Sequence, residues 1–359
     1  MIKYQSDSPL SLENEKPKRI LIVQTAFIGD VVLITALIRE SALLFPEAQI
    51  DVLLIPSTAA LLKNNPHINQ LIVYDKKKKN LFFSIVGLLK SRHYDLALIP
   101  HSSARTAIIL WLAGIKVRIG YNRWFARHLL THRLNHRVDP TRKAHKIEKL
   151  LNLLSLFTKE KLNMDTELYP DVKDYQFSDS ILSQNTDNRK VVLIAPGSVW
   201  ATKRWNKNYY TEVCKTFQDN GLFVILSGSK SEETLCQEIM EKCSNKESAS
   251  IINICGKSTL LQTAAIIKKC DLVLCNDSGT LHIANAMKTT VFAIFGPTVR
   301  GFGYYPFREG DHIFEVDLPC RPCGGHGHHA CPLKHHRCMN DIKPEMICDK
   351  ILSFIAEEK

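Results

Sequence analysis

Short apolar runs alternate with stretches of helical spacing along most of the chain. The runs that predict strands are RILIVQ, IDVLLI, QLIVY and DLALIP, followed by KVVLIAPG, LFVILSG, IINIC, DLVLCN and VFAIFG. Between them, stretches such as DVVLITALIRESALLF and TLLQTAAIIKKC have the apolar spacing of amphipathic helices. Strands that alternate with helices build βαβ units, whose strands are parallel. The pattern therefore predicts an α/β chain with parallel sheets.

The alternation is interrupted once, by a polar stretch near residues 170–188, and then restarts. A chain of 359 residues is long enough for two domains that each bury a core. We therefore predict two Rossmann-like domains, residues 19–175 and 176–359, that face each other across a cleft, with the last helix able to pack back on the first domain. Residues 1–18 are polar and lack the apolar core of a signal peptide, so we expect a disordered leader.

Composition agrees with a soluble globular protein, because 45% of the residues are hydrophobic and 23% are charged. No run of eighteen apolar residues is present, so no segment is predicted to span a bilayer. The net charge of +11 is unevenly distributed: nine Lys or Arg and one acid, Asp139, lie between Lys116 and Lys146, and DKKKKN forms a second basic cluster. Such clusters either keep a face solvated or attract nucleic acid, anionic lipid headgroups or phosphorylated glycans.

Eleven cysteines without a signal peptide indicate reduced thiols. Four of them form a cluster that encloses five histidines: Cys320, Cys323, Cys331 and Cys338. The spacing of the first pair fits a zinc knuckle, whereas the later gaps fit no common zinc finger. The cluster is therefore compatible with a structural zinc site, with reduced thiols that pack a loop, or with a disulfide.

The segment CNDSGTLHIA combines a strand end with a helix start. Asp277 or Ser278 can cap the helix, and the backbone N–H groups of Ser278 and Gly279 lie at the positive end of its dipole. His282 follows one helical turn later and can point to the same end. An ordinary N-cap explains the first two residues but not the addition of Gly279 and His282, so we interpret the segment as an anion site.

Two further loops follow strands that should end at the same edge of the sheet, where ligands of parallel sheets bind. In APGSVWATKRWN, Thr202 and Lys203 offer a hydroxyl and a positive charge, as a diphosphate leaving group requires, although an ordinary exposed loop would look alike. In LSGSKSEET, Ser231 can cap a helix and Glu232 can accept hydroxyls of a ribose or a sugar. The alternative for Glu232 is a first-turn glutamate that complements the helix dipole.

The first strand runs through VQTAFIGDVV into a helix, where a phosphate-binding loop would be expected. Asp30 stands at the start of this helix and would repel a phosphate. On spacing alone, Asp30 is either an N-cap or first-turn acid, or a carboxylate with a chemical role.

Four motifs together resemble the heptosyltransferases of lipopolysaccharide core synthesis, glycosyltransferase family 9: TAFIGDVVLITALI, PGSVWATKRW, NDSGTLHIANA with VFAIFGPT, and CRPC…CPLKHHRCM. They follow the family's order from about residue 19 to 342 and are most similar to the heptosyltransferase II branch. The resemblance implies a GT-B fold and a glycosyltransferase that moves L-glycero-D-manno-heptose from ADP-heptose to a lipid A–core acceptor, as the second heptose on heptose I.

By motif position, the resemblance implies a donor site in the second domain, formed by Thr202, Lys203, Glu232, Asp277, Ser278, Gly279 and His282. Asp30 falls on the family's proposed catalytic base. The expected inversion, from a β-linked donor to an α-linked product, requires one carboxylate that takes the acceptor hydroxyl's proton, on the domain opposite the diphosphate. Asp30 meets that requirement.

The acceptor that the resemblance implies would explain the basic residues of the first domain. Arginines can hold phosphates or carboxylates of the inner core through bidentate contacts. The candidates are Arg105, Arg118, Arg123 and Arg127. No Asp-x-Asp pair follows a strand, so we expect no required metal cofactor, with cationic side chains and helix N-termini at the leaving group. We further expect a cytoplasmic monomer in peripheral contact with the inner membrane and no nucleic-acid partner.

Two alternatives stay open. A transferase of the same fold could use another nucleotide sugar or acceptor, because one sequence does not reveal the pocket that selects heptose. A basic nucleic-acid-binding protein with a zinc module would explain the charge and the cysteine cluster. However, no nucleic-acid fold signature is present, and the strand-end motifs would go unexplained.

Overall fold

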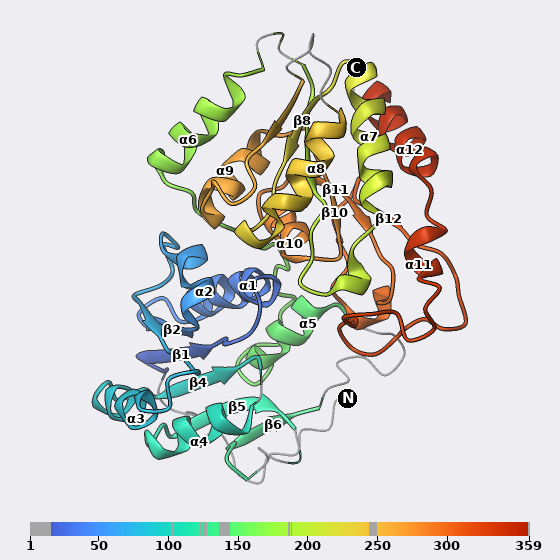
Figure 1. Cartoon of the computed structure of the whole chain (residues 1–359). Coiled ribbons are helices and arrows are strands. Elements are labelled where there is room, and N and C mark those ends of the chain that lie inside the picture. Colours follow the sequence, from blue (N-terminus) through green and yellow to red (C-terminus); the bar gives the residue numbers. More distant parts are fainter. Residues whose placement is uncertain are drawn as a thin grey trace. The chain divides into compact units, whose positions relative to one another are not determined.

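The chain divides into two compact units, unit 1 (residues 1–169) and unit 2 (residues 170–359). A computed structural model describes residues 16–101, 103–122, 124, 128–135, 144–185, 187, 189–243 and 250–357 (Figure 1). Most of the predicted leader, residues 1–15, lies outside the described residues. No helix of the described part is both long and apolar enough to cross a bilayer.

Unit 1 is built on a six-stranded parallel sheet in the order β3-β2-β1-β4-β5-β6. The strands are β1 (Arg19–Val23), β2 (Gln49–Leu54), β3 (Gln70–Val73), β4 (Leu96–Ile99), β5 (Val117–Tyr121) and β6 (His132–Leu134). Their central members are apolar and fully buried, as expected of a sheet covered on both faces. The strand order reverses between β1 and β4, which is where parallel sheets of this type bind ligands.

The helices of unit 1 connect these strands. They are α1 (Ile28–Leu44), α2 (Pro56–Ala59), α3 (Leu81–Ser91), α4 (Ala104–Leu112) and α5 (Lys146–Leu151), with 3-10 turns η1 (Ala60–Leu62) and η2 (Asn152–Leu154). α3 and α4 pack against each other and share one apolar core with β1, β3 and β4.

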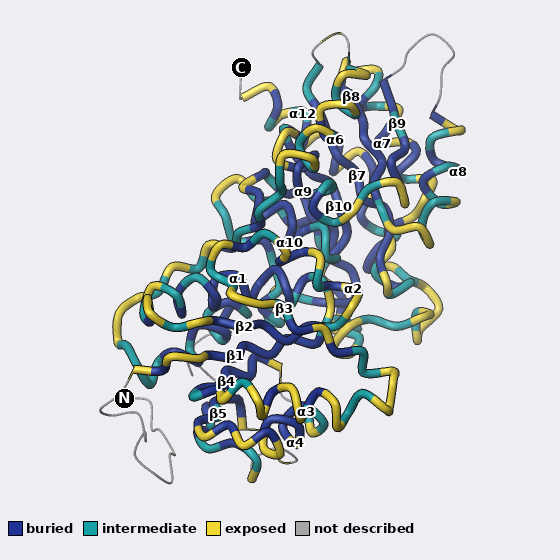
Figure 2. Tube along the Cα trace, turned by 90° about the vertical axis from the view of Figure 1, so that its left-hand side faces the viewer, coloured by how far each residue is buried: buried dark blue, intermediate teal, exposed yellow. Residues whose placement is uncertain are grey.

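Unit 2 repeats the same topology in the order β12-β11-β10-β7-β8-β9, again parallel. Its strands are β7 (Val191–Ala195), β8 (Phe223–Leu226), β9 (Ile251–Asn253), β10 (Leu272–Asn276), β11 (Thr290–Ile294) and β12 (His312–Phe314). The predicted α/β class with parallel sheets is thus confirmed in both units. Figure 2 shows the central strands of both units as buried chain.

The helices of unit 2 include a long C-terminal one. They are α6 (Val172–Leu182), α7 (Lys207–Asp219), α8 (Glu233–Cys243), α9 (Leu260–Lys269), α10 (Gly279–Ala286), α11 (Arg337–Asn340) and α12 (Pro344–Glu357), with 3-10 turns η3 (Ala201–Lys203), η4 (Lys230–Glu232) and η5 (Arg300–Phe302). α12 packs along α7 of its own unit, and Ile347, Ile351 and Ile355 join the core there (Figure 1).

The polar stretch after residue 170 is a helix rather than a linker. Asp171 caps α6, accepting hydrogen bonds from the N–H groups of Lys173 and Asp174, and the Asp174 carboxylate accepts one from the Asp171 N–H. The helix packs against α9 and buries Ser178. The predicted boundary between residues 175 and 176 therefore falls inside α6, which belongs to unit 2.

Candidate functional site

A buried ion pair lies at the carboxyl end of β10. The Lys203 ammonium is 2.6 Å from the Oδ2 atom of Asp277, and the Thr298 hydroxyl donates to the same oxygen at 2.6 Å. The two charged side chains are only 12% and 7% exposed. Because an unpaired charge is costly at such depth, each group holds the other in place. The structure thus brings together two residues that the sequence motifs placed in the donor site.

Asn276, the last residue of β10, fixes the loop that carries Lys203. Its fully buried amide accepts hydrogen bonds from the Trp205 N–H and the Tyr210 hydroxyl, both at 3.1 Å. The same amide donates to the carbonyls of Pro196 at 2.9 Å and Gly197 at 3.1 Å. Sequence reasoning missed Asn276, although a single amide at the end of an otherwise apolar strand was a usable signal.

The start of α10 departs from the predicted capping. Ser278 occupies the N-cap position in extended geometry, but its side chain makes no capping hydrogen bond. The Asp277 carboxylate is engaged by Lys203 and Thr298 instead. The Ser278 Oγ atom is buried and has no partner among the described residues. A helix N-terminus beside an unpartnered hydroxyl fits an anionic ligand, and Gly279 opens the helix there while His282 lies buried one turn further.

Glu232 lies against the loop that follows β7. A Cβ atom at Gly197 would lie 1.8 Å from the Glu232 Oε1 atom, so the carboxylate packs directly on a backbone that only glycine allows. The other carboxylate oxygen accepts from the N–H and the hydroxyl of Ser229, both at 2.8 Å. Ser229 is therefore the N-cap here, and the predicted cap at Ser231 is wrong. One carboxylate oxygen of Glu232 is thus occupied by the cap at Ser229, and the other lies against the backbone of Gly197.

Residues 326–336, which are rich in histidine, hold Thr202 through hydrogen bonds. The Thr202 N–H donates to the His328 carbonyl at 3.1 Å, and its hydroxyl donates to the same carbonyl at 3.0 Å. The His328 N–H donates to the Thr202 hydroxyl at 2.8 Å, and the His336 ring lies 2.8 Å from the Thr202 carbonyl. Gly327 has a φ of 95°, and a Cβ there would crowd the Thr202 hydroxyl at 3.1 Å. Sequence reasoning missed this contact.

The four clustered cysteines, Cys320, Cys323, Cys331 and Cys338, are free thiols. Burial raises the pKa of Cys338 to about 11, and burial together with its cysteine neighbours raises the pKa of Cys323. Cys323 also donates its Sγ–H to the Cys320 carbonyl at 3.0 Å. Across the part of the chain that is described, no three His, Cys, Asp or Glu side chains are arranged to hold a metal ion.

In unit 1, Asp30 lies in the first turn of α1, which has Phe27 as its N-cap and no side-chain cap. It follows β1, at the reversal of strand order. Between strand and helix, Gln24 and Thr25 are buried, and their side-chain polar atoms have no partner within the described residues. Unsatisfied buried polar groups are rare in folded proteins, so this strand end fits a polar ligand. Gln24 and Thr25 were missed from the sequence, although polar residues directly after an apolar strand were visible.

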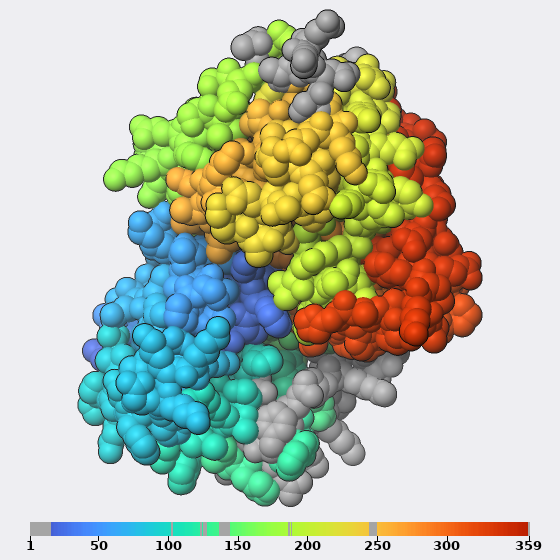
Figure 3. Space-filling view, viewed as in Figure 1, coloured from blue at the N-terminus to red at the C-terminus, as the bar shows by residue number. Residues whose placement is uncertain are grey.

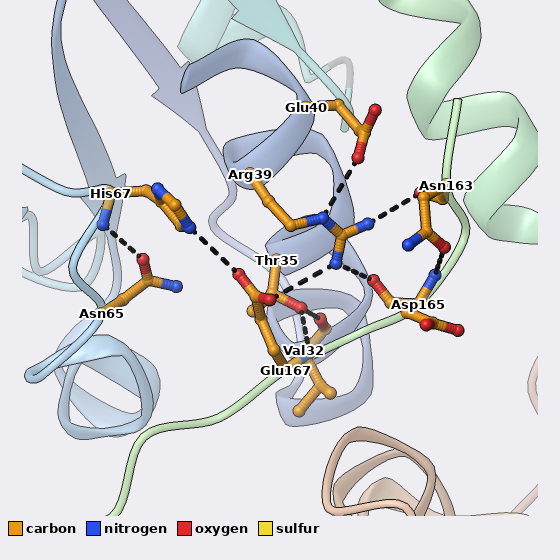
Figure 4. Close-up of polar contacts among 9 residues, drawn as sticks. All are labelled: Val32, Thr35, Arg39, Glu40, Asn65, His67, Asn163, Asp165 and Glu167. Carbon is orange, nitrogen blue, oxygen red and sulfur yellow. Dashed lines mark hydrogen bonds and ion pairs between the residues drawn. The ribbon is translucent and has the colours of Figure 1, made fainter. Parts of the chain in front are cut away.

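The helix that carries Asp30 is anchored to the end of unit 1 by Arg39. Its guanidinium donates to the carbonyls of Asp165 at 2.7 Å and Asn163 at 2.9 Å, and its Nε atom is 3.1 Å from Glu40 (Figure 4). The Glu167 N–H donates to the Thr35 hydroxyl at 3.0 Å. These contacts fix α1 against residues 163–167.

Arg105 and Lys76 meet near the same strand end. The Lys76 ammonium donates to the Thr25 carbonyl at 3.1 Å, and Arg105 donates to the Lys76 carbonyl at 2.6 Å. The Arg105 guanidinium also lies over the Tyr74 ring, 5.6 Å from its centroid. Burial, and secondarily the Arg105 charge, lowers the pKa of Lys76. Two cations next to Thr25 suit an anionic group of a ligand, and Lys76 was not singled out from the sequence.

The other predicted arginines are placed differently. Arg118 donates to the carbonyls of Leu129, at 2.7 Å, and Ile115, so its donors serve the loops beside β5. Burial lowers the pKa of Arg118. Arg123 and Arg127 lie outside the described residues.

Comparison with known proteins agrees with the motifs. The family model described as glycosyltransferase family 9 (heptosyltransferase) matches residues 83–334. A lipooligosaccharide heptosyltransferase 2 of Campylobacter jejuni is 33% identical over 49% of this chain and 54% of its own length, so the chain spans about half of that relative. The lipopolysaccharide heptosyltransferase 2 of Escherichia coli K12 is 24% identical over 95% of this chain and 99% of its own length.

Solved structures show the same fold. The structure of the Escherichia coli ADP-heptose LPS heptosyltransferase II superposes with a TM-score of 0.77 at 22% identity, over 95% of this chain and 99% of that one. The Escherichia coli heptosyltransferase WaaC with ADP gives a TM-score of 0.68 at 14% identity, over 94% and 98%. The predicted GT-B fold is thereby confirmed.

Proposed function

The chain belongs to glycosyltransferase family 9 (heptosyltransferase), and from this premise we propose that it transfers a heptose from ADP-heptose to the inner core of lipopolysaccharide. We assign it the second heptose, added to heptose I, because the relatives that match nearly its whole length carry the name heptosyltransferase 2. The acceptor is a lipid A–core molecule, and the enzyme works in the cytoplasm at the inner membrane.

The buried Lys203–Asp277 pair beside the start of α10 carries this proposal. A leaving diphosphate gains negative charge as its bond to the sugar breaks, so fixed cations and N–H groups stabilise the transition state. Lys203 supplies the cation, and the N-terminus of α10 with the Ser278 hydroxyl supplies donors. Asp277 holds Lys203, and we assign its carboxylate a second role, contact with hydroxyls of the sugar. No metal ion is required in this scheme.

Asp30 is the general base of the proposed reaction. The acceptor hydroxyl oxygen forms a bond to the anomeric carbon while the bond from that carbon to the diphosphate oxygen breaks. The hydroxyl proton passes to the Asp30 carboxylate, and ADP leaves. One displacement inverts the anomeric centre. Asp30 belongs to unit 1 and the donor residues to unit 2, so the reaction needs both units.

The acceptor's charged groups fit the cations of unit 1. The Lys76 ammonium donates to the Thr25 carbonyl, in the loop that leads into α1, and Arg105 donates to the Lys76 carbonyl. A phosphate or carboxylate of the inner core held there would place the acceptor near Asp30. Arg118 is less suited, because backbone carbonyls occupy its donors.

The test incubates the purified chain with ADP-heptose and defined truncated-core acceptors, with and without a chelator. We expect a product heavier by one heptose, α-linked to heptose I, in equal yield in both conditions. Transfer only from another nucleotide sugar, or only to a core without heptose I, would replace this assignment by another substrate. Loss of transfer on chelation would show that a metal takes part.

A further inference from the structure

α3 and α4 form an apolar surface on unit 1. Their inward residues, among them Ile85, Leu89, Ile109 and Leu110, belong to the core of the unit. The two helices pack side by side, so their outward faces adjoin. Figure 3 shows this stretch, in cyan and blue-green, at the molecular surface.

The outward face of α4 carries no charged residue. Its exposed positions are Ala104, Ile108, Trp111 and Leu112, which share one side of the helix. Trp111 is 53% exposed. Helices on a globular protein's surface ordinarily turn charged and polar residues outward, so this face is unusual.

The outward face of α3 continues the apolar surface. Phe83 is 79% exposed and Leu88 is 40% exposed, and the two lie at opposite edges of the solvent-exposed part of the helix. Figure 2 shows exposed chain along α3. We call Phe83, Leu88, Ile108, Trp111 and Leu112 the α3–α4 face. Contiguous exposed apolar side chains of this kind mark interaction sites.

Positive charge predominates around the α3–α4 face. Residues 75–118 contain nine Lys or Arg and two acids, Asp75 and Asp95, and the Asp95 carboxylate accepts hydrogen bonds from the N–H groups of Lys18 and Arg19. Five exposed lysines have no ion-pair partner within the described ranges: Lys77, Lys78, Lys79, Lys90 and Lys116. The first three precede α3, Lys90 lies in its last turn, and Lys116 follows α4.

We propose that the α3–α4 face binds the surface of an anionic lipid bilayer. Apolar side chains that include Trp and Phe, bordered by lysines, are the pattern of helices that lie in a membrane interface. Trp prefers the headgroup level, and each Lys is attracted by anionic lipids. A second copy of the chain is a poor occupant, because pairing two such faces would bring like charges together.

Residues that precede α3 and begin α4 are linked to the loop that leads to Asp30. Lys76, next to the exposed lysines, donates to the Thr25 carbonyl, and Arg105 at the start of α4 donates to Lys76. Binding to a bilayer would therefore hold this strand end near lipid headgroups. The inference deepens the proposed function, since the proposed acceptor is itself anchored in a membrane.

The test is flotation of the full chain with vesicles of phosphatidylcholine, alone or mixed with phosphatidylglycerol. Wild type should float with the mixed vesicles only. The double variant F83S/W111S should bind at least roughly tenfold more weakly, because two aromatic side chains no longer enter the interface. Replacing Lys77, Lys78 and Lys79 by Gln should weaken binding by about fivefold per lysine at low salt. Val172→Ser, at an exposed apolar residue of α6, is the matched control and should bind as wild type.

Two readouts separate the outcomes. Thermal melting should be unchanged in F83S/W111S, and transfer to a delipidated, water-soluble core acceptor should keep the wild-type rate. Unchanged flotation of F83S/W111S would overturn the inference, and so would a wild-type dimer that this variant converts to monomers without any vesicle binding. Flotation without transfer to the soluble acceptor would leave the bilayer face standing and remove the proposed function instead.

Discussion

At the carboxyl end of β10 every polar atom of the Asn276 amide has a partner, whereas at the carboxyl end of β1 neither polar atom of the Gln24 amide has one among the described residues. The two units share one strand order, so the difference does not come from topology. In unit 2 the polar groups at this strand end form hydrogen bonds and an ion pair that fix Lys203 and its loop. Unit 1 leaves polar groups available beside Asp30. We infer that the Lys203 loop of the proposed donor site is held in place before substrate binds, while the proposed acceptor site is completed by its ligand.

Asn276→Leu should remove the hydrogen bonds at the end of β10 and cause the largest loss of stability. The substitution leaves the Trp205 N–H, the Tyr210 hydroxyl and two carbonyls without their partner. Each unsatisfied buried group costs about 1–3 kcal/mol, so we expect the free energy of unfolding in urea to fall by at least about 3 kcal/mol.

The control for that change is Asn206→Ala, which removes only the N-cap of α7. It should cost about 1 kcal/mol. Equal losses for the two asparagines would show that Asn276 does no more than an ordinary cap.

Gln24→Met should leave stability intact and affect acceptor binding instead. The amide has no partner to lose within the described chain, so the free energy of unfolding should stay the same or rise by about 1 kcal/mol. If the amide meets the acceptor, the KM for the acceptor should rise roughly tenfold while ADP affinity is unchanged. Destabilisation comparable to Asn276→Leu would mean that the two strand ends are alike.

Ser278→Ala tests a buried hydroxyl of unit 2 that has no partner among the described residues. Its removal should leave thermal stability unchanged, because the hydroxyl makes no cap and no other hydrogen bond in the described structure. ADP affinity, measured by calorimetry, should fall by about threefold to tenfold if the hydroxyl binds the diphosphate. Unchanged affinity would remove Ser278 from the donor site.

The pH dependence of acceptor binding gives the smallest effect. Because the pKa of Lys76 is lowered, its ammonium loses its proton at a lower pH than an exposed lysine does. The KM for an anionic acceptor should therefore rise a few-fold on the alkaline side, and Lys76→Met should raise it at neutral pH and flatten the profile. If the pH profile of the KM keeps its shape in Lys76→Met, another group causes the loss of acceptor binding at alkaline pH.

The parts of the fold that the sequence predicts are those in which local pattern and burial agree. Central strands such as β1 and β10 are apolar except for one terminal residue each and were recognised, whereas the short strands β6 and β12, which begin with His132 and His312, have no pattern of their own. They form because a neighbouring strand offers its hydrogen bonds. The polar stretch that contains α6 was interpreted as the domain boundary because it has few apolar residues, in keeping with the burial of Ser178 alone in this helix.

The candidate site divides in the same way. Lys203, Asp277 and Ser278 follow strand ends, so sequence order was enough to collect them. The contact between Thr202 and His328 joins residues 126 positions apart, and no local pattern encodes it. Gln24 and Lys76 were overlooked because their role depends on what surrounds them: buried surroundings without a hydrogen-bond partner among the described residues for Gln24, and a neighbouring Arg105 for Lys76.

The most direct test compares ADP affinity and single-turnover transfer in Asp30→Asn and Lys203→Met, on the full chain with ADP-heptose and a truncated-core acceptor. Asp30→Asn should bind ADP as wild type does and transfer about 10²–10⁴-fold more slowly, because it lacks the base. Lys203→Met should bind ADP roughly 10–100-fold more weakly, because a charge-assisted contact is lost. A wild-type transfer rate in Asp30→Asn, or weakened ADP binding in that variant with none in Lys203→Met, would contradict the division of work between the two units.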